Sequence, residues 1–190
     1  PHAQQHSDEP LNVSTIDESG ARITIEGRTH DYGDGGVVGG GDRHADMYAR
    51  TAKPLIAQLF DGYNATVLAY GQTGSGKTHT MGTSFDEAEI DGVVPRAVAE
   101  IISRRQQMTQ EGRECLIVCS MCEVYNEEVR DLLADYDPED DEKRVALAVR
   151  EAPNGGGVQI VGLSEREVSS TAEVVSLTRE GTRHRMTAST

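Results

Sequence analysis

The sequence predicts an α/β fold in which helices flank a central mixed β-sheet, and three observations support it. The apolar run Ala65–Tyr70 has β-branched and aromatic members, which is typical of a buried strand. Gly71–Thr78 follows it directly and reads GQTGSGKT, which fits the phosphate-binding pattern G-x-x-x-x-G-K-[ST]. Apolar residues at helical spacing lie on both sides, in residues 46–60 and 94–105. Strand, glycine loop and helix in this order predict a P-loop NTPase fold.

The composition is compatible with a globular domain. The chain has 190 residues, of which 36% are hydrophobic and 26% charged. No apolar run approaches the roughly 20 residues of a membrane-spanning helix, so no membrane span is predicted. The net charge of −14 argues against a surface for nucleic acid or anionic lipid. The first residues lack both an initiator Met and the apolar core of a signal peptide, so we expect an internal piece of a longer protein.

The N-terminal part of the chain is predicted to hold little regular structure. Residues 1–20 are polar and without periodicity, and we expect a disordered lead-in before a domain over residues 21–190. Within that domain, Arg22–Glu26 alternates as a short strand does. Residues 31–42 are glycine-rich and are interpreted as a flexible insertion; a phosphate cradle is the alternative, but no Lys-Thr pair follows.

A helix is predicted over residues 46–60, before the glycine loop. Pro54 conflicts with it, because proline inside a helix costs about 3 kcal/mol unless the helix kinks or begins there. Gly62 is placed to end the helix. Its apolar stripe consists of Ala52, Leu55, Ile56, Leu59 and Phe60.

The glycine loop is the predicted nucleotide site. Backbone N–H groups of residues 72–77 are expected to hold phosphates, because glycines let the backbone approach them closely. Lys77 is expected to neutralise the γ-phosphate and Thr78 to ligate Mg²⁺, and these two are the predicted catalytic residues. The loop residues predicted to bind the cofactor are Gly71, Gln72, Thr73, Gly74, Ser75, Gly76, Lys77 and Thr78.

Two helical pieces and a strand are predicted after the loop. A short helix is expected from Lys77 to Met81, then an acidic loop to Gly92, then a helix with Pro95 in its first turn. Residues 115–124 form a near-continuous apolar run, which predicts a central strand covered on both faces. This run contains the cysteines, which are interpreted as buried free thiols in a reducing cytosol rather than metal ligands; they are Cys115, Cys119 and Cys122.

The C-terminal part is predicted to form a hairpin and a helix. Residues 134–142 are acidic but lack the spacing of a calcium loop, so a solvated loop is expected. Residues 145–149 and 158–161 are predicted to pair through a turn at 153–156. Ser170 or Thr171 can cap a last helix that extends to about residue 184.

Beyond the loop motif, three blocks of sequence resemble the kinesin motor domain. They are residues 62–81, 123–133 and 154–165, and they occur in the family's order. The resemblance covers about residues 46–190 and implies an incomplete kinesin motor domain. It implies ATP and Mg²⁺ as cofactors, and it assigns to His79 a position that packs against adenine.

The resemblance also implies a parent protein that couples ATP hydrolysis to movement along microtubules. Such a protein is expected in the cytoplasm on the cytoskeleton, as a dimer with a coiled coil, and with tubulin as its partner. The family segments N-x-x-S-S-R-S-H and D-L-x-G-S-E do not occur in these 190 residues, so we expect the fragment alone to hydrolyse ATP poorly. The charge of −14 is unexpected for a protein that binds acidic microtubules; we interpret the main binding surface as lying elsewhere in the parent.

Two alternatives stay open. Another P-loop NTPase, such as a small GTPase or a transport ATPase, would share the loop, although the N-K-x-D motif of GTPases is absent. A degenerate, non-motor kinesin-like protein that binds nucleotide is the second. The unrecognisable first strand of the family and the glycine-rich residues 31–42 favour that second alternative.

Overall fold

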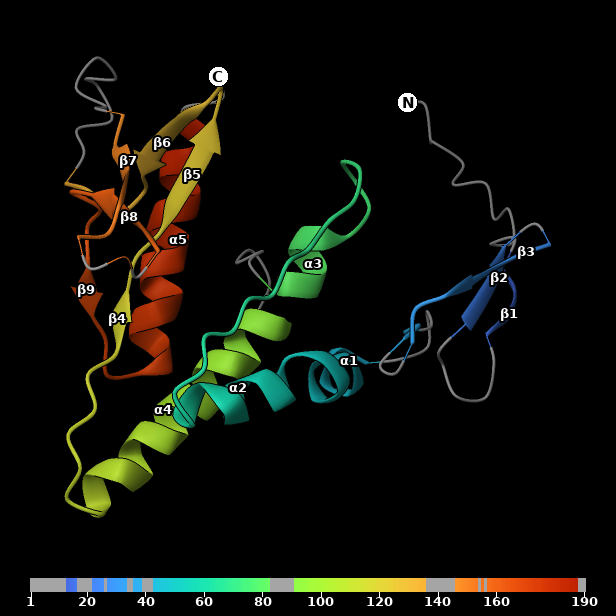
Figure 1. The fold of residues 1–190 in the computed structure, drawn as a ribbon, viewed down its shortest axis with the longest axis horizontal. Coiled ribbons are helices and arrows are strands. Elements are labelled where there is room, and N and C mark those ends of the chain that lie inside the picture. Colours follow the sequence, from blue (N-terminus) through green and yellow to red (C-terminus); the bar gives the residue numbers. More distant parts are fainter. Residues whose placement is uncertain are drawn as a thin grey trace, which may run out of the picture. The chain divides into compact units, whose positions relative to one another are not determined.

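The structure, a computed structural model, describes residues 13–16, 22–25, 27–33, 36–38, 43–82, 91–135, 146–153, 155 and 157–187 (Figure 1). Contacts within the chain divide it into two compact units, Pro1–Ala65 and Thr66–Thr190. Among the described residues, none of the helices combines the length and the apolar character that crossing a bilayer requires.

The first unit begins with a three-stranded antiparallel sheet in the order β1-β2-β3. Its strands are β1 (Val13–Ile16), β2 (Arg22–Ile25) and β3 (Arg28–Asp31). Arg22 and Asp31 are register partners, and Arg22 Nε donates to Asp31 Oδ2 at 3.0 Å. This bond, followed by the backbone N–H of Gly33, holds the pKa of the Asp31 carboxyl below its ordinary value.

The strand predicted at residues 22–26 is therefore confirmed as β2. Strand β1 lies inside the predicted lead-in of residues 1–20, where β-branched residues in 13–16 suit a paired strand. The other residues of the lead-in lie outside the described part of the chain, as does half of the glycine-rich segment 31–42.

Two helices follow in the first unit, α1 (His44–Thr51) and α2 (Lys53–Phe60), where the sequence predicts one. The break falls at Ala52, which is fully buried and donates its backbone N–H to Tyr48 O at 3.1 Å. Pro54 lies in the first turn of α2, where its missing N–H costs nothing. The conflict raised by Pro54 is thus resolved by a new helix that begins beside it.

The second unit contains α3 (Lys77–Met81), α4 (Val93–Gln110) and α5 (Thr171–Thr187). All three were predicted, and α4 contacts both α3 and α5 (Figure 1). Residues that line the junction of α4 and α5 include Val94, Pro95 and Val98 of α4 and Thr171, Val174 and Val175 of α5. The apolar stripe predicted for α4 therefore faces α5.

The strands of the second unit form three two-stranded antiparallel sheets among the described residues. β4 (Val118–Cys119) pairs with β9 (Arg166–Glu167), and β5 (Cys122–Tyr125) pairs with β6 (Glu128–Asp131). β7 (Ala148–Glu151) pairs with β8 (Val158–Val161), which confirms the predicted hairpin with its first strand shifted along the chain.

The central strand predicted at residues 115–124 is wrong. Residues 115–124 were expected to form one strand buried on both faces, but only β4 and the start of β5 form there, separated by residues 120–121. Leu116 is 64% exposed and Val124 73% exposed. A buried strand needs neighbours on both edges, and in the described structure β4 and β5 each have one.

The cysteines of this segment are free, as expected, but they are not all buried. Cys122 is exposed, whereas Cys115 and Cys119 are half-buried. Burial raises the pKa of the Cys119 thiol.

The core of the second unit centres on residues 132–133, which follow β6. Leu132 and Leu133 are buried, and the helical Gly181 lies close enough to Leu132 that a Cβ there would be 3.3 Å from the Leu132 Cβ. Polar bonds fix this segment: Leu132 O is 2.8 Å from His184 Nδ1, and Leu133 O accepts a bond of 2.9 Å from Arg166. These contacts join β6 to α5 and β9.

Asp131 reinforces the same junction. Its Oδ1 accepts from the Leu133 N–H at 2.8 Å, and its Oδ2 accepts from the Ser164 N–H at 2.6 Å. One carboxylate thus links the end of β6 to a segment 33 residues further along the chain.

Ser170 caps α5, one of the two caps predicted from the sequence, and it does so within a capping box. The Ser170 Oγ accepts from the Glu173 N–H at 3.3 Å, and the Glu173 carboxylate accepts from the backbone N–H groups of Ser169 and Ser170. The Ser169 backbone bond is the main reason that the pKa of Glu173 lies below its ordinary value.

We expect Leu133→Ala to lower the free energy of unfolding by about 2–5 kcal/mol. The Leu133 side chain has no exposed surface, so its truncation leaves a cavity in the core. Urea titration followed by circular dichroism measures this change. Leu116→Ala, at a largely exposed position, is the control and should cost much less. Equal losses for the two variants would contradict this account of the core.

We expect Glu173 to stabilise the fold in a pH-dependent way. Its pKa is lowered on folding, so its charged form stabilises the protein above pH 4.5, the ordinary value, and this stabilisation is lost as the pH falls through the folded pKa. Glu173→Gln should therefore lower the melting temperature at pH 7 and change it little at pH 3. Glu165→Gln, at an exposed carboxyl that caps no helix, is the control; the same pH profile in both variants would refute the assignment.

Candidate functional site

The Gly71–Thr78 loop turns the chain sharply into α3. Gly74 and Gly76 have φ values of 82° and 87°, in the left-handed region that favours glycine. Between them, the Ser75 N–H donates to Gln72 O at 3.2 Å and forms a turn. Gly76 is the N-cap of α3, and its carbonyl accepts from the Thr80 N–H at 2.8 Å. The loop is therefore a bend that ends in a helix, as the motif requires.

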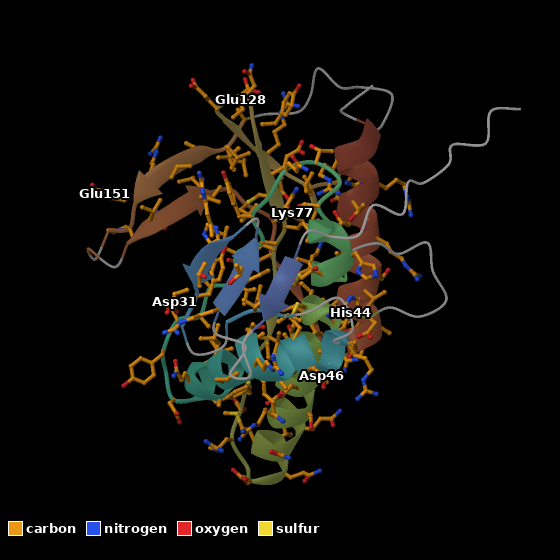
Figure 2. All side chains as sticks on the ribbon, turned by 90° about the vertical axis from the view of Figure 1, so that its right-hand side faces the viewer. Asp31, His44, Asp46, Lys77, Glu128 and Glu151 are labelled. Atoms are coloured by element: carbon orange, nitrogen blue, oxygen red, sulfur yellow. The ribbon has the colours of Figure 1, made fainter. Side chains whose placement is uncertain are left out.

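Lys77 ties the two ends of this loop together. It is the first residue of α3, where Figure 2 labels it, and its Nζ donates to Gly71 O at 2.8 Å and to Gln72 O at 2.6 Å. Its side chain thus extends from the helix back over the start of the loop. The ammonium charge is held beside the backbone whose N–H groups the sequence assigns to phosphate binding.

Thr78 and His79 are the second and third residues of α3, and both are exposed. Their carbonyl groups both accept from the Gly82 N–H, at 3.0 and 3.1 Å. The exposed hydroxyl of Thr78 is thus available to a ligand. The structure brings together all predicted site residues from Gly71 to His79, and their individual roles stay predictions.

The residues fit a nucleoside triphosphate with Mg²⁺. A Cβ built at Gly74 or Gly76 would meet no atom within 4 Å, so the loop is open at both positions. Backbone amides and one ammonium suit a polyphosphate. Mg²⁺ is usually bound through one or two protein oxygens together with substrate phosphates, which suits the single hydroxyl of Thr78.

The strand predicted before the loop is not formed. Residues 65–70 belong to none of the sheets in the described structure, and Leu68 is 84% and Tyr70 95% exposed. A strand exists only through hydrogen bonds to a neighbour, and here no neighbouring strand supplies them. The apolar character of this segment was read correctly, but its burial was not.

A second feature near the loop was not predicted. Residues 82–92 were expected to form a solvated loop, whereas Gly82 and Gly92 are both buried and lie in backbone contact. Residues 83–90 are outside the described part of the chain. A glycine at each end of an insertion between two helical patterns was the available signal.

Comparisons with known proteins agree with this geometry. The kinesin motor domain family model matches residues 3–190. The human kinesin-like protein KIF21B is 41% identical over 155 residues, which is 76% of this chain and 9% of that protein. The Arabidopsis thaliana kinesin-like protein KIN-4C is 40% identical over 172 residues, which is 84% of this chain and 13% of that protein.

A solved structure of a fast kinesin, described for its ATPase mechanism and its interactions with microtubules, gives a TM-score of 0.75 at 32% identity. The match covers 92% of this chain and 48% of that one, so the chain spans about half of the solved domain. The fold class predicted from the sequence, a P-loop NTPase, is confirmed by this match. With the family model matching nearly the whole chain, the chain belongs to the kinesin motor domain family.

Proposed function

We propose that this chain is the ATP-binding part of a microtubule motor. The observation that supports this most directly is the Gly71–Thr78 loop, bent at its glycines and joined end to end by Lys77, in a chain of the kinesin motor domain family. Such a loop binds a triphosphate by positioning its phosphates and neutralising their charge, and it forms no covalent bond to them.

In the proposed binding step, Lys77 exchanges its carbonyl partners for a phosphate oxygen. In the structure Lys77 Nζ donates to two carbonyl oxygens, and a bound phosphate oxygen offers it a full negative charge instead. The Thr78 hydroxyl would hold Mg²⁺, which neutralises phosphate charge when bound. His79, exposed beside Thr78, is proposed to pack against the adenine, as the family resemblance implies.

Hydrolysis is proposed to need the rest of the parent domain. The serine-rich and D-L-x-G segments that the resemblance assigns to the γ-phosphate and water do not occur in these 190 residues. We therefore propose that residues 21–190 are a partial motor domain that binds ATP, and that the fragment alone hydrolyses it slowly.

Tubulin is the proposed partner, and the parent is proposed to act on the cytoskeleton in the cytoplasm as a dimer with a coiled coil. By its resemblance to the family, the hairpin β7–β8 is proposed to make a minor contact with tubulin, and its Arg150 is exposed. The net charge of this chain is −14, which disfavours binding to acidic tubulin. This supports a main tubulin-binding surface elsewhere in the parent protein.

We expect Lys77→Ala to abolish detectable ATP binding, because a charge-assisted bond to phosphate contributes about 1.5–3 kcal/mol, or roughly 10–150-fold in affinity, and more in a desolvated site. Titration with a fluorescent ATP analogue in the parent motor domain measures the affinity. Lys53→Ala, which removes an exposed lysine from α2, is the matched control. Equal affinities for Lys77→Ala and the unaltered protein would refute the role of Lys77.

We expect microtubules to stimulate ATP turnover by the parent motor domain, and the 190-residue chain alone to turn over little ATP at any microtubule concentration. Phosphate release, measured with increasing microtubules, tests both parts. Tight ATP binding by the parent without stimulation would favour the non-motor alternative. Turnover that microtubules leave unchanged would instead contradict the proposed coupling of hydrolysis to microtubule binding.

A further inference from the structure

Two buried glycines hold α3 against the beginning of α4. A Cβ built at Gly82 would lie 2.5 Å from Asp91 O and 2.8 Å from Gly92 Cα. A Cβ built at Gly92 would meet the backbone of Gly82 and would lie 2.8 Å from the carbonyl carbon of Met81. Real Cβ atoms do not approach backbone so closely, so only glycine fits at either position. We call this contact the glycine junction (Gly82 and Gly92).

An acidic side chain fixes the α4 side of the glycine junction. Asp91 Oδ1 accepts from the Gly92 N–H at 2.8 Å and from Arg96 Nε at 2.7 Å. Arg96 lies in the first turn of α4, so one carboxylate oxygen ties the residue before Gly92 to the helix that follows it. The α4 helix itself is anchored on α5 through residues such as Val98.

The α3 side of the glycine junction is bonded directly to the nucleotide site. The Gly82 N–H donates to the carbonyls of Thr78 and His79, so Gly82 ends the helix that begins at Lys77. That helix has only five residues, and so short a helix is not stable without packing partners. Its orientation, and with it the directions of the Lys77 and Thr78 side chains, must come from what it packs on. In the described structure α3 packs against α4.

We infer that the glycine junction, fixed by Asp91 and Arg96, positions Lys77 and Thr78 for a nucleoside triphosphate with Mg²⁺. These are positioning residues, since none of them belongs to the phosphate loop. The inference rests on the proposed function, because it concerns how the same site is held. It assigns a role in nucleotide affinity to residues that the loop motif does not include.

The test is nucleotide affinity in the parent motor domain, measured with a fluorescent ATP analogue, with Mg²⁺ and again with excess EDTA. Gly92→Ala should push α3 away from α4 and weaken binding with Mg²⁺ by about tenfold. Because Thr78 is the proposed Mg²⁺ ligand, the gain in affinity that Mg²⁺ normally brings should largely disappear. A general loss of stability would weaken binding with and without Mg²⁺ alike.

Gly112→Ala is the matched control. Gly112 follows the other end of α4 and also has a positive φ, 76°, but no atom lies within 4 Å of a Cβ built there. Alanine there also has to adopt a positive φ, but without the clash, so affinity and Mg²⁺ dependence should stay at the level of the unaltered protein.

A milder pair of variants covers the case in which Gly92→Ala does not fold. Asp91→Asn keeps an acceptor for the Gly92 N–H but removes the charge opposite Arg96, and Asp91→Ala removes both. Binding with Mg²⁺ should weaken in the order unaltered, Asn, Ala, while circular dichroism shows a folded protein.

The inference is overturned if the unaltered protein binds the analogue and Lys77→Ala does not, yet the variants at Gly92 and Asp91 match Gly112→Ala in affinity and in Mg²⁺ dependence. Failure of the unaltered protein to bind the analogue would overturn the proposed function itself, and the inference with it.

Discussion

The bond from Lys77 to the carbonyls of Gly71 and Gln72 is the constraint on which the site depends. A loop of backbone amides can receive a phosphate only if it is already bent, because bending it during binding would cost conformational entropy for every residue fixed. The glycines allow the bend, and the Lys77 ammonium holds it by joining the loop's end to its beginning. In the proposed function the same ammonium also supplies charge to a triphosphate, so one side chain would both shape the loop and neutralise its ligand.

The sequence predicts the bend of the phosphate loop well because the relevant physics there is local. Glycine at positions 74 and 76 is required by the backbone angles of the loop itself, and the helix that begins at Lys77 follows from the same eight residues. Capping is equally local, so the start of α5 was predicted to within one residue, at Ser170 or Thr171. Pro54 marked a conflict in the predicted helix, which the structure resolves by starting α2 beside it. In each case the residues that mark where the helix begins lie within a few positions of its start.

The strands were predicted less well because a strand depends on its neighbours. Residues 65–70 and 115–124 both have the composition of buried strands. In the described structure, residues 65–70 pair with no strand and are largely exposed. Residues 115–124 are interrupted, and β4 and β5 each pair on one edge. The glycine junction was missed for a related reason. Its evidence is a contact between Gly82 and Gly92, and periodicity reports which residues are apolar, not which backbones meet.

The second unit leaves apolar surface exposed, and the chain matches only about half of a solved kinesin chain. An apolar groove of about 350 Å³ lies between α4 and β4, and its lining includes Ile101 and Ile117. Together with the exposed Leu68 and Tyr70, it leaves much apolar surface in water, at a cost of roughly 25 cal/mol for each Å². This chain covers 48% of the fast kinesin that shares its fold. The phosphate loop and the helix caps form from nearby residues, but the strands leave apolar surface exposed. We therefore expect the chain to bind the proposed nucleotide more tightly when further protein segments cover this surface.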